Sequence, residues 1–204
     1  MRHAKSKSTG SILAISAALL LSGCVSFGAK PPAQLLTLDA VQKVPAGTVR
    51  SAGAGRTLIV TDPDAPKMLD TVRVPVQVSP TSVAYVTKVQ WADTPRHLFR
   101  NLLAETISAS TDRIVIDSGQ FSGDGGQRLS GELVAFGIDG TSHNAVVTYD
   151  AVLMTPNGVA IARQRFTATV PVSGKIDPMT IGVPLNGAAN KVATDVATWV
   201  ALTR

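Results

Sequence analysis

The chain has 204 residues, 45% of them hydrophobic and only 4% aromatic, with a formal net charge of +5. Arg2, Lys5 and Lys7 supply three of these charges, so the sequence after residue 23 carries a net charge of only +2. It has no cluster of Lys and Arg, which argues against nucleic-acid binding, and its length fits one domain with one hydrophobic core.

The first 24 residues have the layout of a secretory signal. Basic residues come first, an apolar run from Ile12 to Leu21 follows, and small residues precede Cys24. The run has about ten residues, whereas a membrane-crossing helix needs ~20, so a membrane span is a poor interpretation. An ordinary signal peptide followed by a chance cysteine is the alternative.

The segment Leu21-Ser22-Gly23-Cys24 resembles the bacterial lipobox. In that class of signals the cysteine sulfur is acylated and the cysteine becomes the first residue of the mature protein. Cys24 is the only cysteine of the chain, so it has no disulfide partner within it. The resemblance implies lipidation at Cys24, with Leu21, Ser22 and Gly23 completing the lipobox.

This interpretation divides the chain into three parts. We expect residues 1–23 to form a lipoprotein signal peptide, residues 24–32 a lipidated tether, and residues 33–204 a single domain. Val25 and Ser26 include no aspartate, the inner-membrane retention signal familiar from enteric bacteria. We therefore expect an outer-membrane protein, lipid-anchored and facing the periplasm.

The first part of the domain contains short strands and a loop. Leu35–Leu38 is predicted to be a strand, Gln42–Gly55 a loop rich in Gly, Ala and Ser, and Arg56–Thr61 a buried strand.

Two further strands are expected before the first helix. Valines alternate with other residues from Val72 to Val78, which is the period of a strand. Pro75 within it predicts an edge position, because proline has no N–H to donate to a sheet. Val83–Val89 is predicted to be one continuous strand that ends near Trp91.

Two helices are predicted. Thr94 can cap the first, and Pro95 suits its first turn. Apolar residues then recur at spacings of three and four, as expected of a helix lying on a sheet; they are Phe99, Leu102, Leu103, Thr106 and Ile107. The second helix ends the chain, with a stripe formed by Leu185, Ala188, Ala189, Val192, Val196 and Trp199.

The second half of the domain is rich in strands. A short strand at Ile114–Ile116 precedes three long ones at Arg128–Ile138, Asn144–Met154 and Val159–Val170. Short turns join the long strands, which predicts a three-stranded antiparallel meander. The expected fold class is α+β, with a mostly antiparallel sheet and two helices packed on one face.

The sequence offers no convincing catalytic or metal-binding residues and implies no cofactor. His97 and His143 have no metal-ligating partner at helical spacing, and no serine lies in a Gly-x-Ser-x-Gly turn. A triad of scattered residues remains open, because its members need not be neighbours in sequence. Gly123–Gly126 lacks the Gly-Lys-Ser/Thr ending of a phosphate loop, and the acids around Asp62 lack the glycine and glutamate of a calcium loop.

Several segments, in order, resemble the ABC-type transport auxiliary lipoproteins. The segments are Leu36-Thr37-Leu38, Leu58-Ile59-Val60, Met68-Leu69-Asp70, Trp91-Ala92-Asp93-Thr94-Pro95, Leu129–Phe136, Val152-Leu153, Arg165-Phe166 and the helix that carries Trp199. Two positions depart from the usual pattern of the family. A tyrosine usually precedes the first Leu-rich segment, where this chain has Leu35 or Leu36, and an arginine often follows the Leu-Asp pair, where it has Thr71.

The resemblance implies a non-enzymatic subunit of an envelope lipid-transport system, with an MCE-domain protein as its partner and a homo-oligomer as a further expectation. It makes Met68, Leu69, Asp70 and Trp91 candidates for partner contact, although a buried role for Trp91 is the common alternative. The loops Gln42–Gly55 and Ala65–Asp70 are further candidates. A scaffold or regulatory lipoprotein that binds another periplasmic protein, or a hydrolase with a scattered triad, are the competing functions.

Overall fold

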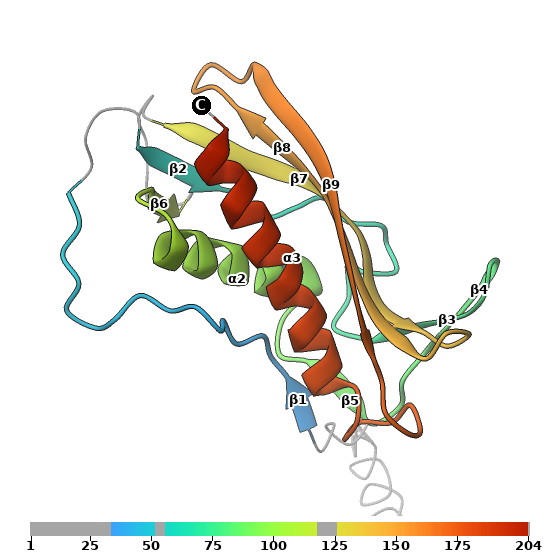
Figure 1. Cartoon of the computed structure of the whole chain (residues 1–204). Coiled ribbons are helices and arrows are strands. Elements are labelled where there is room, and N and C mark those ends of the chain that lie inside the picture. The colour runs from blue at the N-terminus through green and yellow to red at the C-terminus, as the bar shows by residue number, and fades with distance from the viewer. Residues whose placement is uncertain (1–33, 52–55, 118–125, 204) are drawn as a thin grey trace, which may run out of the picture. The chain divides into compact units, whose positions relative to one another are not determined.

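The computed structural model describes residues 34–51, 56–117 and 126–203 (Figure 1). The predicted signal peptide, tether and Cys24 lie outside these residues, as do Gly123–Gly125 of the glycine-rich segment. The described elements are β1 (Gln34–Leu36), β2 (Thr57–Val60), β3 (Pro75–Ser79), β4 (Ser82–Tyr85), β5 (Val89–Trp91), α2 (Pro95–Ser110), β6 (Ile114–Asp117), β7 (Gln127–Asp139), β8 (Asn144–Met154), β9 (Ala160–Pro171) and α3 (Gly182–Leu202).

Strand β7 organises the main sheet. On one edge it pairs with β8, and β8 pairs with β9, both antiparallel, so the predicted meander and the α+β class are confirmed. The other edge of β7 is shared end to end by two strands that run parallel to it. Strand β2 pairs with the start of β7 through Leu129, and β3 pairs with its end at Ile138 and Asp139. Between them, Asp64 forms an isolated parallel bridge with Glu132.

The prediction that Pro75 marks a sheet edge is wrong. Strand β3 lies between β4 and β7, and Pro75 is its first residue. A proline is compatible with that position because only the ladder inside the strand needs its N–H groups. The edge is formed by β4, which is largely exposed.

The strand predicted at Val83–Val89 is divided in two. Lys88 has a positive φ of 64°, an uncommon conformation for a residue other than glycine, and it lies in the turn between β4 and β5. Strand β5 then leaves the main sheet and pairs in parallel with β1.

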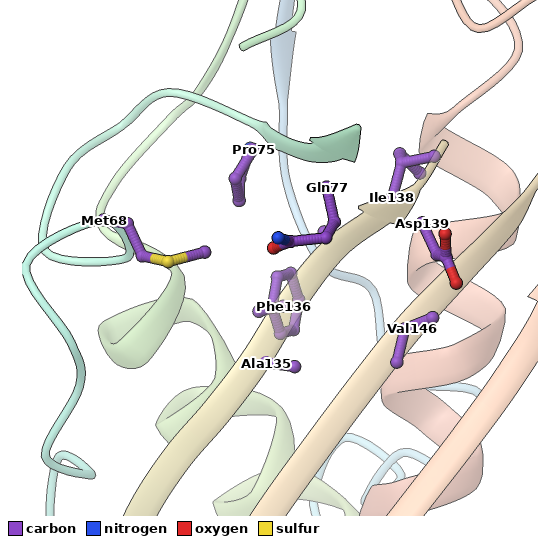
Figure 2. A pocket seen from close by; sticks show the side chains of 9 residues that line it. Met68, Pro75, Gln77, Ala135, Phe136, Ile138, Asp139 and Val146 are labelled. Carbon is purple, nitrogen blue, oxygen red and sulfur yellow. The ribbon is translucent and has the colours of Figure 1, made fainter. Parts of the chain in front are cut away.

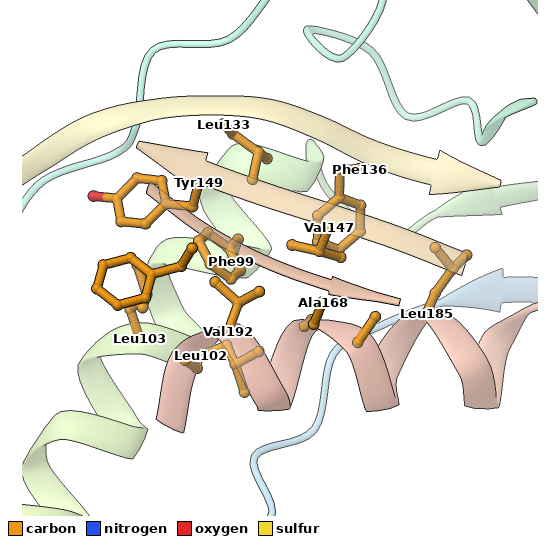
Figure 3. Close-up of a cluster of buried hydrophobic side chains, with 14 of the residues drawn as sticks. Phe99, Leu102, Leu103, Leu133, Phe136, Val147, Tyr149, Ala168, Leu185 and Val192 are labelled. Atoms are coloured by element: carbon orange, nitrogen blue, oxygen red, sulfur yellow. The ribbon is translucent and has the colours of Figure 1, made fainter. Parts of the chain in front are cut away.

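Both helices cover one face of the sheet, and the core lies between the two layers (Figure 3). On β8 the alternate residues Ala145, Val147, Tyr149, Ala151 and Leu153 are all buried, as the period of a strand predicts. The predicted apolar residues of α2 are buried as well, and so are those of α3 except the half-buried Trp199.

A row of aromatic rings runs through this core. Trp91 contacts Phe136 edge-on at 5.3 Å between ring centroids, Phe136 contacts Phe99 at 6.2 Å, and Phe99 contacts Tyr149 at 5.3 Å. The Tyr149 hydroxyl donates to the Ser130 carbonyl over 2.8 Å, and burial raises the pKa of this phenol. The rings connect the sheet, the first helix and β5 into one packed unit.

The start of α2 differs from the prediction. Thr94 is the N-cap residue, but its side chain makes no capping hydrogen bond. Instead the Asp93 carboxylate accepts from the Thr94 N–H at 2.6 Å, and the Thr94 carbonyl accepts from the N–H of His97 at 3.0 Å.

The loop predicted from Gln42 has no helix or strand in its described part, and with the residues after β1 it forms an arm, residues 37–51, along the helices. Asn190 accepts from the Val41 N–H at 2.8 Å and donates to the Asp39 carbonyl at 2.9 Å. On α2, Glu105 accepts from the Val44 N–H at 2.7 Å. Side chains of both helices therefore hold the backbone of the arm.

Neither of the two described helices is long and apolar enough to cross a membrane.

The burial of α3 gives a stability prediction. Replacing Val196 by Asp should lower the free energy of unfolding by at least about 3 kcal/mol, because an unpaired carboxylate would enter the core. Leu102→Asp in α2 should have a similar effect. Val183, in the first turn of the same helix as Val196, is exposed, so Val183→Asp should change stability by no more than about 0.5 kcal/mol. Urea denaturation of the three variants measures the difference, and equal stability of Val196→Asp and Val183→Asp would contradict the packing.

Candidate partner-binding site on the helix-free face of the sheet

An apolar hollow opens where β3, β7 and β8 meet, and we call it the sheet hollow (Figure 2). Its volume is about 220 Å³. The described residues that line it are Met68, Pro75, Gln77, Ala135, Phe136, Gly137, Ile138, Asp139 and Val146. Alternation along β7 and β8 places Ala135, Gly137 and Val146 on the face opposite the core, because Phe136 and Val147 point into it.

A β-bulge sets up this arrangement. Leu133 pairs with Tyr149 and Ala135 with Thr148, so Val134 is an extra residue on β7. The bulge restarts the alternation, and two small residues, Ala135 and Gly137, then face the hollow.

Gly137 forms the floor of the hollow and must remain small. A Cβ atom at this position would lie 2.6 Å from the Pro75 carbonyl oxygen and 2.8 Å from its side chain, closer than atoms can approach. The glycine therefore allows β3 and β7 to approach closely.

The size and chemistry of the hollow favour binding of one apolar group. Ligand pockets usually measure ~300–1,000 Å³, so this hollow fits a single apolar side chain or a short hydrocarbon segment, and not a whole lipid. Asp139, the one ionisable residue of the lining, accepts hydrogen bonds from the backbone N–H groups of Thr141 and Ser142. Hydrogen bonds from Ser142 and Thr141 lower the pKa of this carboxyl, which holds the turn after β7.

A charged cluster lies on the same face, farther along β8. Arg165 donates to both carboxylate oxygens of Asp150, at 2.6 and 2.7 Å, and Arg163 adds a contact of 3.2 Å. The two arginine side chains are mostly exposed, whereas Asp150 is buried beneath them. The hydrogen bonds from Arg165 are the main cause that lowers the pKa of Asp150, and Arg163 acts in the same direction. The cluster gives this part of the face a polar, charged surface beside the apolar hollow.

The structure separates the four residues predicted to contact a partner. Met68 lines the sheet hollow, and Asp70 lies at the surface beside Arg96 and Lys67, at 3.4 and 3.3 Å. Leu69 and Trp91 belong to the core instead, with exposed fractions of 0% and 2%. Their apolar side chains pack between the layers, so neither offers a surface to a partner in this conformation.

The two loops predicted as a contact surface do not lie together. Met68, in the second loop, reaches the sheet hollow, whereas the described part of the first loop lies on α2 through Val44 and Arg50. The sequence does not predict the hollow itself, because its lining comes from two segments that are about sixty residues apart. Its only local signal is the pair of small residues Ala135 and Gly137 on an otherwise bulky strand.

The described histidines, His97 and His143, lie at separate places in the fold. His97 lies 3.3 Å from Asp62 and 3.9 Å from Asp93, at the surface near the start of α2. His143 is exposed in the turn between β7 and β8. Among the described residues, no three His, Cys, Asp or Glu side chains are placed to hold a metal ion.

Asp150 gives a prediction about pH. A carboxyl whose pKa is lowered by folding stabilises the protein above its unfolded pKa of about 3.9, and that contribution is lost as the pH falls through the folded value. Asp150→Asn should therefore lower the Tm at pH 7 by about 2–4 °C, and the difference from the unmodified protein should shrink below pH 4.

Asp112→Asn provides the control, because Asp112 and its partner Arg56 are both largely exposed and such pairs contribute little. Thermal unfolding followed by circular dichroism measures both variants. A constant difference between pH 7 and pH 3 for Asp150→Asn would show that its charge is not the cause.

Known structures share this fold. The crystal structure of protein XCC0632 from Xanthomonas campestris is similar with a TM-score of 0.67 and 18% identity, over 83% of this chain and 95% of that one. The crystal structure of an uncharacterized protein has a TM-score of 0.59 and 18% identity, over 74% of this chain and 96% of that one. At this identity the two structures show a common fold alone.

Sequence comparison identifies the family. No curated protein matches the chain. The family model of the ABC-type transport auxiliary lipoprotein component matches residues 36–197, which include every described element from the end of β1 to most of α3. The chain therefore belongs to the family of ABC-type transport auxiliary lipoproteins.

Proposed function

We propose that this protein is a non-enzymatic subunit of an MCE-domain lipid transporter, anchored in the outer membrane through Cys24 and facing the periplasm. In this function the domain binds the MCE protein by the helix-free face of its sheet. The observation that carries the proposal is the sheet hollow, an apolar site on an accessible face, in a chain of a transport auxiliary family.

The size of the hollow favours a protein partner over a lipid cargo. A site of about 220 Å³ accepts one apolar side chain, and such pockets commonly hold the residues that dominate a protein interface. The core between the sheet and the helices is packed with the aromatic row and with leucines that are fully buried. A larger hollow of about 620 Å³ lies between β9 and α3, but most of the residues that line it are polar, which does not suit an acyl chain. We therefore place the lipid path in the partner, with this domain serving to dock it.

The charged cluster also supports the helix-free face of the sheet as the surface that binds the partner. Charged groups around an apolar site contribute specificity and the rate of association more than affinity. Arg163 and Arg165 stay largely exposed although they share one carboxylate, so their remaining N–H groups are available at the rim of the interface.

Homo-oligomerisation is part of the proposal. In the described part of the chain, β9 pairs only with β8, which leaves its outer edge open over twelve residues. An open edge of this length is a ready surface for a second copy, because its backbone groups lack partners in the sheet.

The docking surface can be tested with two matched variants. Val146 lines the hollow, whereas Val49 is an exposed valine of the arm, which lies along the helices and away from the helix-free face. Val146→Arg should weaken binding of the purified MCE protein about thirtyfold, which corresponds to about 2 kcal/mol at a hot spot. Val49→Arg should change it little. Surface plasmon resonance on the lipidated protein measures both. Equal affinities of the two variants would move the docking surface elsewhere, and no binding by the unmodified protein would favour the scaffold function.

The anchor has its own prediction. Mass spectrometry of the mature protein should find acyl chains on Cys24, and Cys24→Ala should leave the membrane fraction or remain an uncleaved precursor. Each buried CH₂ contributes ~0.8 kcal/mol, so two or three chains hold a protein in the membrane essentially permanently. An unmodified Cys24 in mature protein would contradict the anchor, and recovery with the inner membrane alone would contradict the location.

A further inference from the structure

One end of the domain carries exposed apolar side chains at the point where the tether joins it. Nine large hydrophobic side chains of the described residues are exposed, and Leu35, Met179 and Val183 lie at this end. Met179 is 79% exposed and Val183 83%. Met179 lies in the turn before α3, and Val183 lies in the first turn of the helix. We call this end, formed by Leu35, Lys88, Lys175, Met179 and Val183, the tether end.

Backbone pairing brings the elements of the tether end together. Strand β1 begins at Gln34 and pairs there with Val89, the residue after Lys88. A Cβ atom on Gly182 would lie 3.1 Å from the Leu36 side chain, so β1 also contacts the first turn of α3. Figure 1 shows β1, β5 and the start of α3 at the same end of the domain.

The charges of the tether end suit a lipid surface. Lys88 and Lys175 are both exposed. The acid closest in sequence to Lys175, Asp177, accepts a hydrogen bond from the Met179 N–H at 2.8 Å, so it serves the turn before α3. Apolar side chains flanked by lysines are the composition of segments that lie in the interface of a membrane with anionic lipids.

The length of the tether limits how far this end can lie from the bilayer. Gln34 follows Cys24 by ten positions, and a fully extended chain over these ten steps reaches at most about 36 Å. This maximum reach keeps the tether end close to the lipid surface. Other ends of the domain have no comparable constraint.

We propose that the tether end is a membrane-contact surface, in which Met179 and Val183 enter the lipid interface and Lys88 and Lys175 contact lipid phosphates. This inference rests on the proposed lipid anchor at Cys24. The contact orients the domain on the membrane.

The experiment uses the mature lipidated protein in vesicles of phosphatidylethanolamine and phosphatidylglycerol. Acylation blocks Cys24, so a cysteine introduced by Val183→Cys can be labelled selectively with a polarity-sensitive dye. Val159→Cys is the matched control: Val159 is also an exposed valine, at 64%, and lies in the turn between β8 and β9. Strands β8 and β9 pair from Met154, beside this turn, to Asn144 at their other end. Val172 follows β9 at that other end and leads toward α3, so Val159 lies at the end of the strands away from the start of α3.

The dye at residue 183 should shift to a blue emission and be quenched by brominated lipid, whereas the dye at residue 159 should show neither effect. If the dye emits at both positions as it does in water, and mass spectrometry shows that Cys24 is acylated, the proposed membrane contact is wrong while the lipid anchor stands. A blue shift without quenching by brominated lipid would also overturn the membrane contact, because a protein would then cover this end. An unacylated Cys24 would instead contradict the anchor on which the proposed function depends.

Discussion

The domain depends on one long strand that is paired along both edges. Strand β7 carries the meander on one side, and on the other it accepts β2 at its start and β3 at its end. Two hydrogen bonds of Asp64 hold the segment between β2 and β3 in register with β7. The Asp64 N–H donates to the Gly131 carbonyl at 2.8 Å, and the Asp64 carbonyl accepts from the Leu133 N–H at 2.8 Å. Among the described residues, β7 alone joins the β2–β6 pair, the β3–β4 pair and the β8–β9 pair into one sheet.

The sheet has two faces with different tasks. One face is covered by α2 and α3 and filled by the aromatic row, which holds the layers together. The other face has no helix among the described residues, and it combines the apolar hollow with the charged cluster around Asp150. The packed face supplies rigidity, so the open face can remain shaped for contact.

Much of this fold can be read from the sequence, because strands and helices impose short periods on it. The alternation along β8 and the stripe on α2 are local patterns, and both predicted the buried face correctly. The place of Pro75 could not be predicted in this way. Whether a strand is an edge or an inner strand depends on its neighbours, and the neighbours of β3 include β7, some sixty residues later.

The candidate site was predictable only in part, for the same reason. Met68 was singled out by family resemblance and does line the hollow, but Leu69 beside it belongs to the core. Adjacent residues outside regular elements can face opposite ways, and no period tells which one is exposed. The hollow itself arises from the bulge at Val134 and from the close approach that Gly137 allows. Neither feature has a distinctive sequence signal, since both follow from the pairing of distant strands.

The attachment of the N-terminal arm has a mechanical consequence. Any tension carried by the chain before Gln34 enters the domain through β1 and then the arm. The arm follows α3 in the direction of the helix, since Asp39 donates to Asn186 and Val41 donates to Asn190 one turn later. A pull along the helix axis therefore loads these bonds in shear, all at once, whereas a force that lifts the arm off the helix would break them one after another. The attachment is thus strongest against tension directed along α3 and weakest against peeling.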